Sequence, residues 1–254
     1  MKRFLFILLS LVLASANFFL YFVQADLRNV ALLVVTVFFI VVSAIFIKLT
    51  LKKVPVHNFL ILPTALVLGF SSLTLFFPNL NLPFRIGLWL LGSLAFYVNF
   101  LCLNVFAVSL ETEVKLPLLR AAVTVSSLVV SVALFFIFTA VYKIEAIFAI
   151  QGALIFLSTY LLNRFYFWAA SLESHLGNYE REVFLSGLVA FEVATATAFL
   201  PLEAFFRGFL LISIVYVVNG LLLARLKHAL NRRVVTEYAT VLGLVILLLM
   251  AFNF

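Results

Sequence analysis

Long runs of apolar residues, separated by short polar segments, dominate the chain. Each run reaches or approaches the roughly 20 residues that a helix needs to cross a bilayer core of about 30 Å. The nine runs cover residues 4–24, 30–50, 58–77, 85–109, 117–141, 145–163, 183–200, 206–224 and 236–253. Because backbone groups in lipid must be paired within their own segment, these runs predict transmembrane helices.

The runs lack the alternation of polar and apolar positions that is typical of a transmembrane barrel. Residues 30–40, for example, are almost continuously apolar, whereas a barrel strand changes face at every residue. No repeat of fixed period is apparent along the chain. The sequence therefore predicts an all-α polytopic transmembrane bundle, with residues 1–254 forming a single integral membrane domain.

The first run also has features of a signal peptide. Lys2 and Arg3 precede an apolar segment, and Ala14-Ser15-Ala16 has the form of a cleavage site. The apolar run continues through Val23, however, and is long enough to span a bilayer. We favour an uncleaved first helix; cleavage would leave eight spans.

Composition supports the membrane assignment. Of the 254 residues, 66% are apolar and 11% are charged, whereas soluble domains are about half apolar and about a quarter charged. This excludes a soluble enzyme, a disordered tail, a collagen and a secreted disulfide scaffold. The single cysteine, Cys102, allows no internal disulfide.

The positions of the basic residues predict the orientation. If Met1 lies in the cytoplasm, thirteen of the 17 Lys and Arg fall in cytoplasmic segments, as the positive-inside rule requires. The other four are Arg28, Arg85, Lys143 and Arg207. We expect a bacterial-type cytoplasmic (plasma) membrane, with the lipid bilayer and other membrane proteins as partners and no nucleic acid.

The segment after the sixth run is the longest cytoplasmic connection. We expect the sixth helix to extend to about Leu176, with a turn at Gly177-Asn178. Four side chains in and beside this segment have the chemistry of metal ligands: Glu173, His175, Glu180 and Glu182. A solvated charged loop is the simpler interpretation, and we expect no metal and no cofactor.

Glu192 lies at the middle of the seventh run. Ionisable groups inside a span cost about 2.5–3.5 kcal/mol on insertion scales and mark functional sites by default. Thr195 follows three residues later on the same helix face, and Ala190, Ala194 and Ala198 form a stripe suited to close helix packing. Glu192 is thus either a proton or cation site or a hydrogen-bonded carboxyl that fixes helix packing, and we favour the second.

Two polar stripes precede and follow the loop between the fourth and fifth runs. Helical spacing places the members of each stripe on one face. The first comprises Ser93, Tyr97, Asn104 and Glu111, and the second comprises Arg120, Thr124, Ser127 and Ser131. They provide hydrogen bonds between helices or, less expectedly, the wall of a polar pocket open to the cytoplasm.

Residues 201–208 resemble part of a protease motif. In register with Arg207, Glu203 fills the second glutamate of the E-E-x-x-x-R motif of glutamate-based intramembrane proteases of the CAAX-processing type, but Leu202 stands at the first. The later histidine motifs of that family are absent. An ion pair between Glu203 and Arg207, one helical turn apart, is the simpler interpretation.

The sequence contains no phosphate-binding loop, zinc-protease motif or nucleophile elbow. With few Gly and Pro, it also lacks the matched broken helices of many carriers. We therefore expect a non-enzymatic accessory or scaffold component of the membrane. The alternative is a small-solute or lipid carrier that uses a polar cavity with Glu192, and a more remote alternative is an intramembrane lipid-modifying or proteolytic enzyme.

Overall fold

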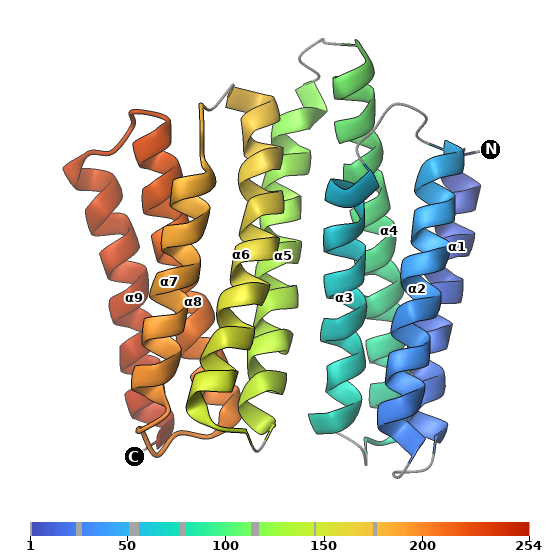
Figure 1. Ribbon diagram of the computed structural model, residues 1–254, viewed down its shortest axis with the longest axis horizontal. Helices are drawn as coiled ribbons and strands as arrows, with labels where there is room; N and C mark the ends of the chain where they lie inside the picture. The colour runs from blue at the N-terminus through green and yellow to red at the C-terminus, as the bar shows by residue number, and fades with distance from the viewer. Residues whose placement is uncertain are drawn as a thin grey trace. The chain divides into compact units, whose positions relative to one another are not determined.

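The computed structural model is helical throughout the residues that it describes, 2–23, 27–50, 56–76, 80–112, 117–144, 146–174 and 177–253 (Figure 1). No strand occurs within these ranges. Their α-helices are α1 (Lys2–Phe19), α2 (Arg28–Thr50), α3 (Val56–Phe76), α4 (Leu82–Thr112), α5 (Pro117–Lys143), α6 (Phe148–Ser174), α7 (Glu180–Thr197), α8 (Ala204–Leu226) and α9 (Arg232–Asn253), with a 3-10 turn, η1 (Leu20–Phe22), after α1. Each predicted run coincides with one helix, so the predicted all-α class is confirmed.

Six helices in the described part of the chain are long and apolar enough to cross a membrane. These candidate spans are Phe4–Phe22, Val30–Lys48, Leu82–Glu111, Pro117–Lys143, Ala204–Leu226 and Arg232–Ala251. Of the remaining helices, α3 contains a shorter apolar stretch, Asn58–Ser72. Helix α7 is less apolar and carries Glu180, Arg181, Glu182 and Glu192 within its length.

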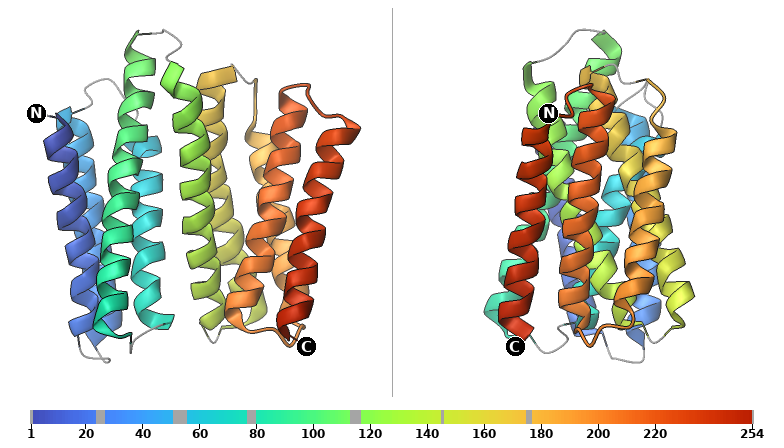
Figure 2. Two further views of the ribbon diagram at one scale, coloured as in Figure 1. Left: turned by 180° about the vertical axis from the view of Figure 1, so that it is seen from behind. Right: turned by 90° about the vertical axis from the view of Figure 1, so that its left-hand side faces the viewer.

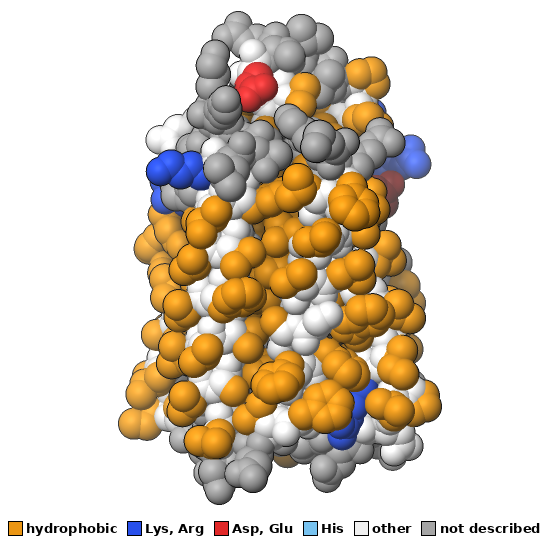
Figure 3. Space-filling model, turned by 90° about the vertical axis from the view of Figure 1, so that its right-hand side faces the viewer, with side chains coloured by type: hydrophobic (Ala, Val, Ile, Leu, Met, Phe, Trp, Pro, Cys, Tyr) orange, Lys and Arg blue, Asp and Glu red, His pale blue; other side chains and the backbone are white. Residues whose placement is uncertain are grey.

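Large apolar side chains are exposed on the outward faces of these helices. Phe4, Leu33 and Leu90 are each more than half exposed. Figure 3 shows one face of the molecule on which hydrophobic side chains cover the middle, with Lys and Arg nearer the two ends. Soluble monomers rarely expose apolar patches of such extent, so this surface is compatible with a lipid environment.

The chain divides into two compact units, unit 1 (Met1–Ala133) and unit 2 (Leu134–Phe254), and α5 crosses the boundary. Within unit 1, α1 packs on α4, α2 packs on α3, and α3 also contacts α4. Figure 2 shows α1 and α4 side by side. Aromatic rings fill the interior of this unit. The centre of the Phe6 ring lies 5.5 Å from that of Phe46 and 6.3 Å from that of Phe100.

Unit 2 repeats the helix pairings of unit 1. Helix α6 packs on α7, α7 packs on α8, and α9 is added beside α8. The second half of α5 contacts α8, where the rings of Phe135 and Phe205 are 5.2 Å apart. In their pairings, α5–α8 therefore correspond to α1–α4.

Spacings of individual residues support this correspondence. In each unit, an arginine is the fourth residue of the last of the four helices, and a serine and an asparagine follow there at the same separation. A serine of the first helix also precedes a tyrosine at the same separation, and that tyrosine lies in η1 in unit 1 and in α5 in unit 2. The pairs are Arg85 and Arg207, Ser93–Asn99 and Ser213–Asn219, and Ser10–Tyr21 and Ser131–Tyr142. The units thus share a pattern that the sequence does not display as a repeat of fixed period.

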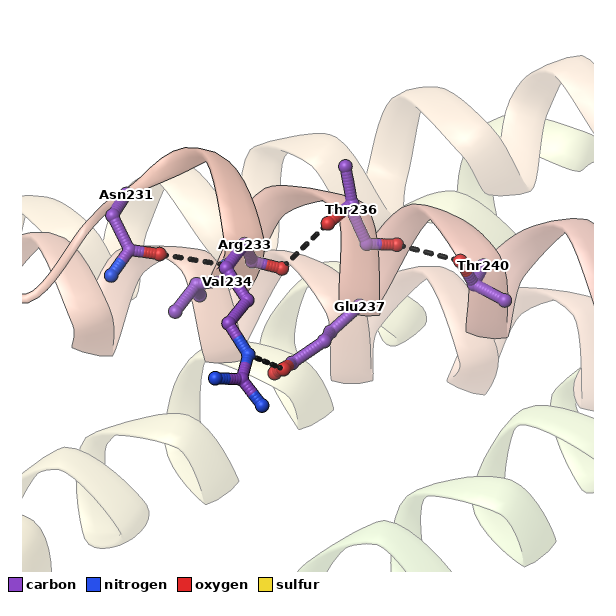
Figure 4. A network of polar contacts seen from close by, with 6 residues as sticks. All are labelled: Asn231, Arg233, Val234, Thr236, Glu237 and Thr240. Carbon is purple, nitrogen blue, oxygen red and sulfur yellow. Dashed lines mark hydrogen bonds and ion pairs between the residues drawn. The ribbon is translucent and has the colours of Figure 1, made fainter.

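The ends of two helices add detail to this arrangement. Helix α6 continues beyond the predicted span to Ser174, as expected, while His175 and Leu176 lie outside the described residues. Helix α9 begins with a side-chain cap, because Asn231 Oδ1 accepts a hydrogen bond from the backbone N–H of Val234 at 2.9 Å (Figure 4). One turn of α9 is bridged by Arg233 Nε and Glu237 Oε1, 3.0 Å apart.

Candidate functional site

Glu192 lies on the exposed face of α7. Thr195 donates a hydrogen bond to the backbone carbonyl of Glu192 at 2.8 Å, so the hydroxyl is directed to the helix backbone. Ala190 and Ala194 are buried on another face of α7. Two alanines of the predicted stripe therefore lie inside unit 2, Ala198 beyond the end of α7 is partly exposed, and the carboxylate of Glu192 points outward.

The two predicted polar stripes have different surroundings. Tyr97 and Asn104 of α4 are half-buried and line a groove, while Glu111 is exposed. Arg120 and Thr124 of α5 are both exposed, and the hydroxyl of Thr124 donates to the carbonyl of Arg120 at 3.1 Å. The wall that α5 contributes to the groove is apolar instead, and consists of Leu118, Ala121, Ala122 and Val125.

The groove in unit 1 has a volume of about 610 Å³ and lies between α1, α4 and the first half of α5. Cavities of about 300–1,000 Å³ with mostly apolar walls and a few polar groups are typical of small-molecule sites. Here the polar groups are the Tyr97 hydroxyl and the Asn104 carboxamide. The structure therefore brings two of the predicted residues together on one apolar groove.

A buried polar cluster lies between α6, α7 and α8, and sequence reasoning missed it. The carboxamides of Asn163 and Asn219 exchange hydrogen bonds of 3.1 and 2.8 Å. Ser186 accepts from Asn163 at 2.8 Å and donates to Asn219 at 2.7 Å. The sequence did contain a signal for this cluster. Asn163 ends the predicted span 145–163, and Asn219 lies within the predicted span 206–224.

Glu182 belongs to the same buried region. It lies one turn before Ser186 on α7, is only 8% exposed, and its Oε2 atom has no hydrogen-bond partner. A buried polar atom without a partner costs about 1–3 kcal/mol. The hydroxyl of Thr159, one turn before Asn163 on α6, is also buried without a partner, so the interior of unit 2 holds unsatisfied polar atoms as well as the hydrogen-bonded cluster.

The corresponding region of unit 1 contains buried polar atoms that have no hydrogen-bond partner. Asn99, which corresponds to Asn219, is fully buried, yet both polar atoms of its carboxamide lack a partner. The hydroxyl of Ser43 on α2 is also buried without a partner. The two units thus share a buried asparagine on their last paired helix, but its carboxamide is hydrogen-bonded only in unit 2.

Each unit also holds an arginine against a tyrosine ring. In unit 1, the Arg85 guanidinium lies 5.1 Å from the centre of the Tyr21 ring, and Nε donates to the carbonyl of Leu80 at 2.7 Å. In unit 2, the Arg207 guanidinium lies 5.9 Å from the ring of Tyr142 and donates to the carbonyl of Leu200 at 2.8 Å. The expected ion pair between Glu203 and Arg207 is replaced by these contacts.

The four residues with metal-ligand chemistry near the α6–α7 connection are divided among different contacts. Glu173 pairs with Lys227 at 3.6 Å, and Glu180 pairs with Arg164 at 3.2 Å. Glu182 is buried within unit 2, and His175 lies outside the described residues. Among the described residues, no three His, Cys, Asp or Glu side chains are grouped to hold a metal ion.

Comparison with known proteins identifies a family. No curated protein and no solved structure matches the chain. A family described as "Protein of unknown function (DUF5656)" matches residues 48–252, from the end of α2 through nearly all of α9. Because this match covers well over half of the sequence, the chain belongs to the DUF5656 family of proteins of unknown function.

Proposed function

We propose that this protein is an integral membrane protein with nine spans and a cytoplasmic N-terminus, in a bacterial-type cytoplasmic membrane, that acts as a non-enzymatic accessory or scaffold component. The distribution of Lys and Arg supports the orientation. Burial supports α6 and α7 as two spans beyond the six candidates. The polar residues that make these helices less apolar include Asn163, Glu182 and Ser186, and all three face the interior of unit 2.

The exposed carboxylate of Glu192 carries the proposal of association. It lies at the centre of the predicted span 183–200, with the exposed ring of Phe184 on the same helix and that of Phe199 just beyond the end of α7. A carboxylate facing lipid near the bilayer centre costs about 2.5–3.5 kcal/mol on insertion scales. A neighbouring transmembrane helix with a hydrogen-bond donor would remove most of that cost, which favours a partner protein on this face.

Photocrosslinking in the native membrane tests this proposal. A photoreactive amino acid at Ala196, one turn from Glu192, should form one product of defined mass, and Glu192→Leu should abolish it. The same probe at the exposed Leu33 of α2 should give no such product. Glu203→Gln, at an exposed carboxylate before α8, is the matched control and should preserve the product.

Purification in mild detergent provides the second measurement. A stoichiometric partner should accompany the unaltered protein and be lost with Glu192→Leu. Recovery of the unaltered protein as a lone monomer, without a crosslinked product at Ala196, would refute the accessory role.

The groove in unit 1 favours a second function, that of a small-solute or lipid carrier. Its volume of about 610 Å³ suits a small amphipathic molecule, with the polar part held by Tyr97 and Asn104. Ala121→Trp, which fills the groove, should abolish transport, whereas Leu94→Trp on the exposed face of α4 should not. For a carrier that uses Glu192, Glu192→Gln should also stop substrate movement while the protein still folds.

A further inference from the structure

A small cavity lies where the end of α1, α3 and the start of α4 meet in unit 1. Its volume is about 20 Å³, and its polar lining residues are Asn17, Tyr21, Arg85 and Trp89. A cavity of at least about 10–15 Å³ can hold one water-sized group if polar partners surround it. This cavity therefore has room for a single oxygen atom of a ligand that approaches from its open side.

Asn17 presents an unused donor to this cavity. Its Oδ1 accepts a hydrogen bond from the Ser71 hydroxyl on α3, which fixes the orientation of the carboxamide. Its Nδ2 has no partner, although the residue is only 8% exposed. A buried amide donor left unpaired is unfavourable, so an acceptor in this cavity would be stabilised.

Arg85 places a fixed positive charge on the same cavity. The hydrogen bond from Nε to the carbonyl of Leu80 and the contact with the Tyr21 ring hold the guanidinium in place. Arg85 also stands in the first turn of α4, where the helix dipole favours negative charge. Trp89 uses its Nε1 donor on Ser15 Oγ at 3.2 Å, so its ring serves as an apolar wall.

We propose that this cavity binds one oxygen of a phosphate group, supplied by the headgroup of a membrane phospholipid. The cavity combines a buried amide donor, a guanidinium and aromatic rings, which is the chemistry of an interfacial phosphate site. Its size excludes a whole phosphate group and admits one oxygen, while the rest of the headgroup lies outside. Inorganic phosphate offers the same oxygens and is distinguished by the experiment.

Unit 2 contains a natural comparison for this site. Arg207 repeats the contacts of Arg85, with a tyrosine ring and a backbone carbonyl that precedes its helix. Phe138, four residues before Tyr142, stands where Asn17 stands before Tyr21, and it is fully buried. The arginine in unit 2 therefore lacks the amide donor, so Arg207→Gln is the matched control variant.

Trp89 provides a direct signal of binding, because the chain contains only one other tryptophan, Trp168. In a Trp168→Phe background, all tryptophan fluorescence comes from the wall of the cavity. The purified protein in a phosphate-free nonionic detergent would be titrated separately with a short-chain phosphatidylglycerol, the diacylglycerol with the same acyl chains, and inorganic phosphate.

Phosphatidylglycerol should change the fluorescence saturably, and diacylglycerol should not. Arg85→Gln and Asn17→Leu should each weaken the apparent affinity at least tenfold, since each removes a hydrogen bond to a charged group. Arg207→Gln should bind as the background protein does. Saturation by inorganic phosphate at equal or lower concentration would overturn the lipid as the source and leave the phosphate site.

Asn17→Asp covers the case in which the other variants do not fold. It preserves the size of the side chain and the acceptor for Ser71, and it replaces the unused donor with an oxygen. This variant should lose phosphatidylglycerol binding while it retains the thermal stability of the background protein. An unchanged affinity in Asn17→Asp, or an equal response to diacylglycerol, would overturn the proposal.

Discussion

Asn163 on α6 and Asn219 on α8 exchange two side-chain hydrogen bonds, of 3.1 and 2.8 Å, in the interior of unit 2. Ser186 on α7 bonds to both carboxamides, so three helices meet at one polar cluster. Each of these residues is buried, and each depends on the others for its partners. Their effects on stability are therefore expected to be coupled.

Asn219→Leu should destabilise the protein by about 1–2 kcal/mol, because Asn163 and Ser186 lose partners inside an apolar bundle. Asn163→Leu should have a similar effect, and the double variant should cost less than the sum of the two. A double-mutant cycle from denaturation in detergent measures the coupling. Ser213→Ala is the control on α8, since Ser213 bonds only to the carbonyl of Phe209 in its own helix. Additive effects of the two asparagine substitutions would contradict the cluster.

Gly208→Ala should separate α5 from α8 and lower the unfolding free energy by about 1–3 kcal/mol. A Cβ at Gly208 would overlap the Thr139 hydroxyl and lie 3.2 Å from the backbone nitrogen of Thr139. Gly243→Ala in α9 is the matched control, because its Cβ would meet no atom within 4 Å. That variant should be neutral or more stable, since alanine favours a helix over glycine. Equal melting temperatures for the two variants would argue against close contact at Gly208.

Cysteine labelling should reveal the proposed orientation. In a Cys102→Ser background, cysteines at Lys143 and Glu203 should react with a membrane-impermeant maleimide in intact cells. Cysteines at Arg120 and Arg181 should react only after permeabilisation. All four positions are exposed, so protein burial does not limit the reaction. If both positions of one pair reacted as the other pair does, the number of spans between neighbouring positions would differ from the proposal.

Stability should fall at high pH through Tyr166, which lies beyond the predicted sixth span. Burial, followed by smaller effects of Tyr238, Tyr216 and Glu173, raises the pKa of its hydroxyl from 10.0 to about 12. The folded state favours the neutral phenol, so this contribution is complete below pH 10 and is lost as the pH rises to about 12. Melting temperatures measured across this range should decline less in Tyr166→Phe. Parallel declines in both proteins would contradict this role.

The sequence was sufficient to predict the helices, because a membrane span has a length and apolarity that are readable in one dimension. Each of the nine runs corresponds to one helix, and the extension of α6 past its span was also predicted. Glu192 was identified from its position in an apolar run. The alanine stripe indicated which face of α7 packs, but the run gives no sign of whether another helix covers the face that carries Glu192.

The polar clusters were harder to predict because they depend on residues from three helices. Asn163, Ser186 and Asn219 lie far apart in the chain, and only the packing of α6, α7 and α8 brings them together. The correspondence between the units escaped detection for a related reason. The helix pairings and a few polar residues recur, while most of the apolar residues between them differ and the separations between helices vary.

The pairing of α1 with α4 has a consequence for biogenesis. Helix α1 leaves the ribosome before α4, the helix that covers much of its buried face. Until α4 is made, Ser10 and Asn17, both buried in the finished protein, lack their final surroundings. Helix α1 must therefore be sheltered, by the insertion machinery or by lipid, until the hairpin of α3 and α4 arrives.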